Sequence, residues 1–179
     1  MNTEQPETNN AIIVIISSTE ADWSREKIVI GCYEPGKYLL SALRCYQRLN
    51  MKKGLLARLA ALFQVLLHRF WSAVCGADIP LDSEIGGGLL IPHPNGIVIH
   101  PQARIGPNCL IFQQVTIGAG SETGLPVIDG HVDIGAGAKI IGGVHIGAHA
   151  RIGANAVVLE DVPGCSTAVG IPARIRKTV

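Results

Sequence analysis

The sequence predicts a mainly β protein in which a parallel β-helix follows a short α-helical region. Isoleucine or valine recurs at every sixth residue through most of residues 79–158, a period that fits neither an amphipathic helix nor a half-buried strand. Small residues often follow the apolar one, as tight corners between short strands require. Aromatic residues make up only 4% of the chain, which suits an interior of stacked aliphatic side chains. Hexapeptide periods of this kind are typical of the parallel β-helix.

The six-residue repeat runs in three series separated by two shifts of frame. Its apolar positions are 79, 85, 91 and 97, then 99, 105, 111 and 117, then 128, 134, 140, 146, 152 and 158. The frame shifts by two residues at GIVIHP and by five extra residues across GAGSETGLPV. Three such faces make a triangular coil of about eighteen residues, so about four to five coils fit between Asp78 and Gly164. A β-sandwich would instead need period-two alternation.

The region before the repeat has a helical composition. Leucine and alanine dominate residues 35–76, and Gly54 separates two stretches that we expect to be helices, residues 37–50 and 55–74. The region contains seven lysines and arginines and no acidic residue. We therefore expect three parts: a peripheral or disordered N-terminal extension over 1–20, an α-helical region over 21–76, and a β-helix domain over 77–179.

Two roles are open for the helix pair. Its apolar stripes can cap the open end of the β-helix and contact other subunits, because an uncapped coil exposes strand edges. Alternatively, its basic faces also lie on anionic lipid as a peripheral membrane contact. Arg58, His68 and Arg69 interrupt the apolar segment and argue against a membrane-spanning helix.

Composition narrows the classes of function and the location. A net charge of +1 gives no general case for nucleic-acid binding. Five cysteines without a CxxC motif predict neither a disulfide framework nor a zinc knuckle, and they fit a reducing compartment. The apolar run AIIVII near the N-terminus is too short to span a bilayer. We expect a cytoplasmic protein, at the inner face of the membrane if the helices bind lipid.

Four motifs together carry a family resemblance: GADIP from residue 76, IPHPNG from residue 91, QxVTIG from residue 113 and VGIPARI from residue 169. Over roughly residues 75–177 the chain resembles the serine acetyltransferase group of left-handed β-helix acyltransferases. The preceding helices resemble the short helical region of its smaller members. The resemblance implies a left-handed coil, a homotrimer, and direct transfer of acetyl from acetyl-CoA to a hydroxyl without a covalent acyl-enzyme.

The resemblance assigns the catalytic roles to His93 and Asp78. His93 matches the family's base, and an imidazole with a pKa near ~6.5 can accept a hydroxyl proton as the new C–O bond forms. Asp78 matches the carboxylate that orients this base and stabilises the imidazolium. The two are separated by slightly less than one coil, which allows them to share a corner. The alternatives are a merely structural corner histidine, a turn-forming aspartate, and His100 as a rival base that does not match the family position.

The resemblance also implies a groove between subunits for acetyl-CoA, the expected co-substrate. The Gly-rich loop 118–127 lies outside the repeat and is expected to cover this groove as a flap. Small residues matching the family contact CoA through their backbone, and basic residues near the C-terminus are candidates for its phosphates or, alternatively, only a soluble tail. These candidates are Gly118, Ala119, Ala136, Gly137, Ala154, Arg174, Arg176 and Lys177.

No metal is expected. His131 and His149 lie one coil apart and therefore in one column, with His145 nearby. Related β-helix enzymes that hydrate carbon dioxide bind zinc through three histidines, but those histidines bridge subunits with a spacing that this chain does not reproduce. A solvated face is the favoured interpretation of these histidines.

Two departures from the serine acetyltransferase pattern bear on the acceptor. The family has an acid before the base, where this chain has Pro92, and an Arg-His-Pro in a flap three residues longer, where this chain has Gly124, Leu125 and Pro126. Both groups expected to bind an amino acid are therefore missing. The pattern is closest to small colanic-acid-type exopolysaccharide O-acetyltransferases.

We therefore expect an acetyl-CoA-dependent O-acetyltransferase acting on a sugar hydroxyl, free or lipid-linked, in surface polysaccharide biosynthesis. Serine O-acetyltransferase of cysteine biosynthesis is the alternative, and a non-catalytic β-helix scaffold is a third.

Overall fold

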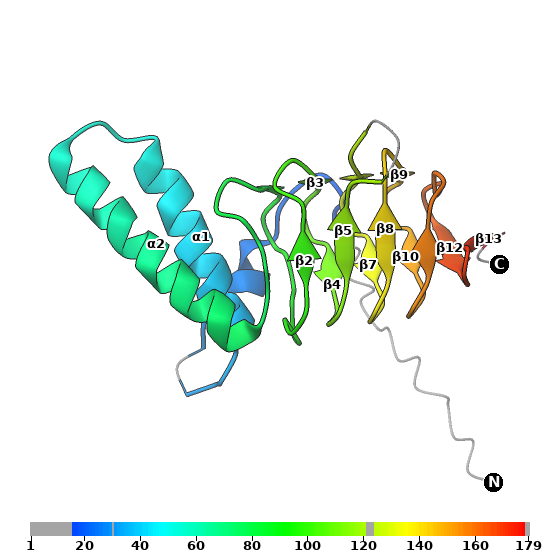
Figure 1. Ribbon diagram of the computed structural model, residues 1–179, viewed down its shortest axis with the longest axis horizontal. Coiled ribbons are helices and arrows are strands. Elements are labelled where there is room, and N and C mark those ends of the chain that lie inside the picture. Colours follow the sequence, from blue (N-terminus) through cyan, green and yellow to red (C-terminus); the bar gives the residue numbers. More distant parts are fainter. Residues whose placement is uncertain (1–15, 30, 121–123, 178–179) are drawn as a thin grey trace, which may run out of the picture.

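The computed structural model describes residues 16–29, 31–120 and 124–177 of the chain. Two antiparallel helices lie at one end of a column of short strands, and the last strand lies at the other end (Figure 1). The helices are α1 (Pro35–Asn50) and α2 (Leu55–Cys75), preceded by the 3-10 turn η1 (Trp23–Glu26). None of the helices in these described ranges is long and apolar enough to cross a membrane.

Local sequence explains where the helices begin and end. Pro35 starts α1, where its missing N–H needs no partner. Gly76 follows α2 in the left-handed region at φ 59°, a common helix C-terminus that glycine adopts without steric cost. The observed helices extend the predicted ones by two residues at the start of α1 and by one at the end of α2.

Within the described residues, thirteen strands of two to four residues form three sheets, which we name the first, second and third face. The first face contains β1 (Glu84–Ile85), β3 (Arg104–Ile105), β6 (Val127–Ile128) and β9 (His145–Ile146). The second contains β2 (Val98–Ile99), β5 (Thr116–Gly118), β8 (Lys139–Ile141) and β11 (Val157–Val158). The third contains β4 (Leu110–Ile111), β7 (Asp133–Ile134), β10 (Arg151–Ile152), β12 (Ser166–Val169) and β13 (Arg174–Lys177).

Among these strands every pair is parallel except that of β12 with β13, which closes the described part of the column at its far end. Every isoleucine and valine of the predicted repeat is buried, and these side chains form one continuous core. The prediction of a three-sided parallel β-helix after a short helical region is therefore confirmed. Its left hand stays a prediction.

The two frame shifts are insertions at corners and leave the strand pairing intact. Across the shift at GIVIHP, Glu84 of β1 pairs with Arg104 of β3, twenty residues later. Across the longer insertion, Arg104 of β3 still pairs with Val127 of β6, and the isoleucines beside them pair as well. Val127, which we expected to end the flap, is thus already part of β6.

The helix α1 covers the first coil of the β-helix, as the capping role requires. Leu39, Leu40 and Leu43 are fully buried and belong to the same core cluster as the repeat isoleucines. Gly36 lies so close to the first coil that a Cβ would come within 2.6 Å of the Ile91 carbonyl oxygen. The open end of the coil is therefore closed by packed apolar side chains.

Residues 16–29, here called the strap, lie against the corner between the first and third faces. Asn108, at that corner, accepts a hydrogen bond from the Asp22 N–H at 2.8 Å through Oδ1. Its Nδ2 donates to the carbonyls of Ser17 and Glu20, both at 2.7 Å. The described part of the predicted N-terminal extension thus packs on the β-helix, and residues 1–15 lie outside the described residues.

Candidate active site

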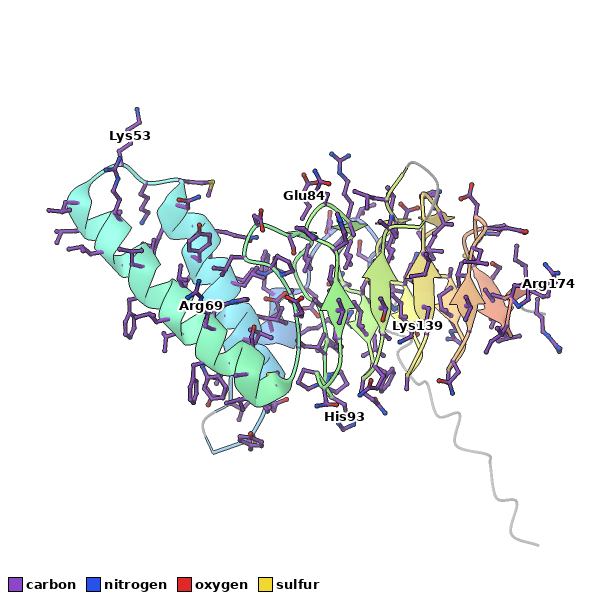
Figure 2. All side chains as sticks on the ribbon, viewed as in Figure 1. Lys53, Arg69, Glu84, His93, Lys139 and Arg174 are labelled. Atoms are coloured by element: carbon purple, nitrogen blue, oxygen red, sulfur yellow. The ribbon has the colours of Figure 1, made fainter. Side chains whose placement is uncertain are left out.

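His93 lies in the turn between β1 and β2, where its side chain is exposed at the edge of the second face (Figure 2). Backbone hydrogen bonds join this turn to the segment that carries Asp78: the Gly96 N–H donates to Gly76 O, and the Asp78 N–H donates to Ile97 O, both at 2.8 Å. The structure therefore brings the two predicted catalytic segments together. In the described part of the chain, the His93 and Asp78 side chains do not hydrogen bond to each other.

Asp78 is held by β-type backbone pairing while its side chain stays exposed. It forms a parallel bridge with Val98, and its carbonyl accepts the Ile99 N–H at 2.9 Å. Aspartate in such a position keeps its carboxylate free to orient a neighbouring imidazole. The rival base His100 has its ring engaged locally, because its Nδ1 accepts the Gln102 N–H at 3.2 Å.

His68 lies close to Asp78, a neighbour that the sequence analysis did not assign to the site. It projects from α2, is buried, and its Nε2 has no hydrogen-bond partner. Burial lowers the pKa of His68, opposed by a hydrogen bond to the Ile79 backbone and by the charge of Asp78. A helical position among apolar neighbours gives no sequence signal for such proximity.

A ladder of polar side chains runs from the His93 turn across the second face. Gln114 Nε2 donates to Asn95 Oδ1 at 2.9 Å, and Lys139 Nζ donates to the Gln114 carbonyl at 2.6 Å. Lys139 begins β8, two strands from β2 on the same sheet. It places a cation on the face whose edge carries His93 (Figure 2), a role that sequence reasoning did not assign.

The predicted CoA-binding residues fall into three groups. Ala136 and Gly137 precede β8 and Ala154 precedes β11, in stacked turns joined by the hydrogen bond from the Asn155 N–H to Ala136 O at 2.8 Å. Gly118 and Ala119 lie at the opposite edge of the second face, where β5 enters the flap. One chain therefore does not bring these two groups into a single groove.

The basic candidates lie at the far end of the column. Arg174 and Arg176 are exposed on β13, with backbones paired to Val169 and Thr167, and Lys177 pairs by its backbone with Ser166. A cavity of about 680 Å³ between the strap and the first face contains none of the predicted site residues.

The histidine column forms a close pair rather than a metal centre. His131 and His149 face each other with their Nδ1 atoms 2.7 Å apart, so one ring donates and the other accepts. Burial lowers the pKa of His131, opposed by the charge of Asp133. Across the described ranges, no group of three or more histidine, cysteine or acidic side chains could hold a metal ion.

Comparison with known proteins places this arrangement in a family, although no family profile matches the chain. A serine acetyltransferase from Staphylococcus xylosus is 43% identical over 152 residues, covering 83% of this chain and 67% of the relative. One from Synechococcus elongatus is 42% identical over 113 residues, covering 62% of this chain and 46% of the relative. The chain thus spans about half to two thirds of the length of these relatives.

Solved structures agree with the sequence matches. Serine acetyltransferase from Brucella abortus in complex with coenzyme A superimposes with a TM-score of 0.69 at 32% identity, covering 82% of this chain and 58% of that one. The soybean enzyme complexed with serine gives 0.68 at 35%, covering 80% and 58%. These matches favour the serine acetyltransferase resemblance over the finer prediction of an exopolysaccharide enzyme. The chain belongs to the serine acetyltransferase family.

Proposed function

We propose that the protein is an acetyl-CoA-dependent O-acetyltransferase whose acceptor is L-serine. Support comes from relatives above 40% identity that carry the name serine acetyltransferase, and from solved relatives holding coenzyme A or serine. The observation that carries the proposal is the exposed His93, whose turn is hydrogen bonded to the segment of Asp78. The serine acceptor replaces the sugar as the leading candidate.

The chemistry needs one base and one orienting carboxylate. The serine hydroxyl oxygen attacks the thioester carbonyl carbon of acetyl-CoA while His93 accepts the hydroxyl proton, so the C–O bond forms as the base becomes charged. Asp78 orients the imidazole and stabilises its positive charge. The C–S bond then breaks, and His93 returns the proton to the CoA thiolate. The acetyl group is then bonded to the serine hydroxyl oxygen, and the imidazole is neutral again.

A homotrimer explains the separation of the CoA-binding candidates. In an assembly of three-sided columns, a groove between two subunits takes one edge of a face from each. Ala136, Gly137 and Ala154 would line it from one subunit, while Gly118 and Ala119 would line it from the neighbour. Small side chains at these positions would let the pantetheine arm of CoA approach the backbone closely.

Recognition of the serine carboxylate falls to Lys139 in this proposal. The flap sequence GAGSETGLPV contains no cation, and Pro92 replaces the acid before the base. Lys139 lies on the same face as the His93 turn and can pair with a carboxylate. The absence of a cation from the flap sequence is also the observation that favours the second candidate, a sugar hydroxyl.

A thiol-release assay with acetyl-CoA tests the proposal. We expect CoA release that depends on L-serine, that is lost with His93→Ala and that persists with His100→Ala. Lys139→Met should raise the KM for serine more than it lowers kcat. Release only with sugars or nucleotide sugars would replace serine by the second candidate. Failure to bind acetyl-CoA in a calorimetric titration would overturn both and leave a β-helix scaffold.

A further inference from the structure

Most large apolar side chains of α2 lie on its outer side, whereas Trp71 packs against the core. Ala61 and Cys75 are buried toward the rest of the protein. The outward stripe, each residue at least 43% exposed, consists of Leu55, Leu56, Leu59, Leu62, Phe63, Leu66, Phe70 and Val74. These positions recur every three or four residues and so share one side of the helix. A contiguous exposed patch of eight large apolar side chains is typical of an interaction site.

Basic side chains frame this stripe. Arg58 and Arg69 are exposed, and their separation of eleven residues, close to three turns, sets them on the same side of α2. Lys52 and Lys53 are exposed in the turn that joins α1 to α2. Lys53 lies at the tip of the helix hairpin (Figure 2). In the described part of the chain none of these four side chains forms an ion pair. No acidic residue occurs from 35 to 76.

The same turn holds an open cavity of about 510 Å³. Its lining includes Lys52, Lys53 and Arg58, together with the apolar side chain of Ala61, and it contains no acid. Gly54 also lines the cavity, and the apolar stripe begins at the next residue, Leu55. A phosphate placed there would meet three cations while an attached hydrocarbon chain could follow the stripe.

We propose that the outer side of α2 and this basic cavity dock the protein onto an anionic lipid surface. The helix, about 31 Å long, lies in the plane of the interface with its leucine and phenylalanine side chains in the acyl boundary. Lys52, Lys53 and Arg58 bind lipid phosphates, each contributing to attraction by the surface charge. This inference is independent of the proposed acetyl-transfer activity.

Charge argues for lipid over a two-fold contact in which the stripes of two copies face each other. Two copies meeting through this stripe would bring Arg58 and Arg69 of each toward the same basic surface of the other. With no acid between residues 35 and 76, nothing on that surface compensates the repulsion. An anionic bilayer supplies acyl chains for the apolar stripe and negative headgroups for the basic side chains beside it.

Vesicle co-sedimentation of the full chain tests the proposal. We expect binding to vesicles of equal parts phosphatidylcholine and phosphatidylglycerol, weakened by salt, and little binding to phosphatidylcholine alone. Lys52→Gln combined with Lys53→Gln should weaken binding about thirtyfold, since each lysine near such a surface contributes about fivefold. Leu66→Ser with Phe70→Ser should also weaken it at least tenfold.

A matched control removes two exposed arginines from the β-helix, Arg104→Gln with Arg151→Gln, and should leave vesicle binding unchanged. Circular dichroism of each variant shows that loss of binding is not loss of folding. Equal binding to both vesicle types, or no binding to either, would overturn the proposal. So would sedimentation velocity showing an assembly that the Leu66→Ser, Phe70→Ser variant dissociates, because the stripe would then be covered by a second copy.

Discussion

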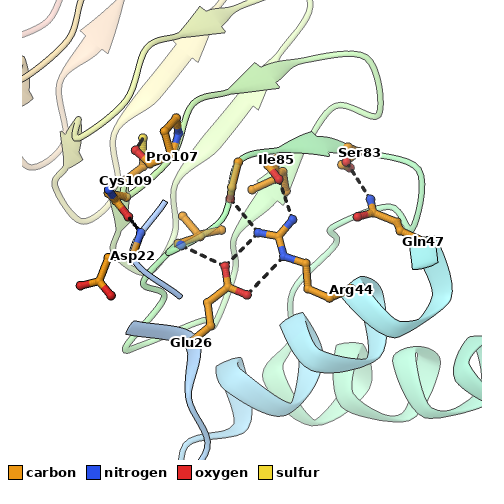
Figure 3. Close-up of polar contacts among 11 residues, drawn as sticks. Asp22, Glu26, Arg44, Gln47, Ser83, Ile85, Pro107 and Cys109 are labelled. Carbon is orange, nitrogen blue, oxygen red and sulfur yellow. Dashed lines mark hydrogen bonds and ion pairs between the residues drawn. The ribbon is translucent and has the colours of Figure 1, made fainter. Parts of the chain in front are cut away.

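Arg44 and Glu26 form a two-point ion pair, in which Nε and Nη2 of Arg44 donate to the two carboxylate oxygens of Glu26 at 3.2 and 2.9 Å. Arg44 also donates to the carbonyls of Ile85 and Gly86 at 2.6 and 2.7 Å, and Glu26 accepts the Leu89 N–H at 3.1 Å (Figure 3). Both side chains are about nine-tenths buried. One pair thus joins α1, the strap and the first coil.

Breaking this pair should destabilise the whole protein. Arg44→Met leaves the Glu26 carboxylate buried without its partner, and we expect the free energy of unfolding to fall by about 3–5 kcal/mol. Urea denaturation measures the change. Arg104→Met removes the exposed pair with Glu84 and should cost no more than about 1 kcal/mol. Equal losses for the two variants would show that burial of the Arg44 pair does not matter.

Replacing His93 should remove catalysis and spare binding. With His93→Ala, we expect kcat to fall roughly 10²–10⁴-fold because the hydroxyl loses its base, while the Kd for acetyl-CoA stays unchanged. Steady-state kinetics and calorimetry measure the two quantities. Asp78→Asn should lower kcat with little effect on acetyl-CoA affinity. If His93→Ala kept its kcat, another residue would be the base.

Alanine substitutions at two glycines distinguish a glycine needed for packing, Gly106, from one proposed to bind CoA, Gly118. A Cβ on Gly106 would lie 2.5 Å from the Gly130 nitrogen, so Gly106→Ala must move backbone and should cost about 1–3 kcal/mol. A Cβ on Gly118 meets nothing closer than 4.0 Å, so Gly118→Ala should change stability by less than about 0.5 kcal/mol. Gly118→Ala should weaken acetyl-CoA binding if its backbone lines the groove. Thermal unfolding and calorimetry distinguish these effects.

Stability should fall in mild acid. The pKa values of His68 and His131 are lowered in the folded protein, so the unfolded chain takes up protons first as the pH drops through ~6.5. Their contribution to stability is therefore present above that value and is lost as the pH falls toward the folded pKa values. We expect a lower Tm at about pH 5.5 than at about pH 7.5. In His68→Leu this difference should shrink, and an unchanged difference would contradict the assignment.

Cysteine modification should follow burial. Cys32 and Cys165 are exposed, whereas Cys75 and Cys109 are buried. Burial raises the pKa of the Cys109 thiol to about 11, which leaves almost no thiolate at neutral pH. Maleimide labelling followed by mass spectrometry should modify Cys32 and Cys165 in the native protein, and Cys75 and Cys109 only in urea. Rapid native labelling of Cys109 would mean that the coil opens.

The β-helix could be predicted because its signal is periodic and local. Ile99, Ile117 and Ile140 carry it directly: each occupies the same place in its coil, and the structure pairs them on the second face. The helix boundaries follow equally local signals, such as Pro35 and Gly76. The neighbouring segments of His93 and Asp78 followed from the coil length, although the distance between their side chains did not.

The remaining contacts were beyond sequence reasoning because they join residues far apart in the chain. In the sequence, Glu26 and Arg44 look like ordinary surface charges, because their pairing depends on how α1 packs against the strap. Asn108 belongs to the repeat and lies at a corner with φ 60°, but its side chain hydrogen bonds to the backbone of the strap. Nothing in the sequence distinguishes Lys139 from the other basic residues, because its position on the same face as the His93 turn depends on the stacking of β8.

The corner insertion between β5 and β6 shows how such a protein can change its chemistry without rebuilding itself. Because extra residues leave the register of Arg104 with Val127 intact, a loop at this corner can lengthen, shorten or change its charge without altering the core. Where such a loop takes part in binding the acceptor, a change of substrate then needs no change in the strands. Proteins that share this column can therefore diverge in substrate faster than they diverge in shape.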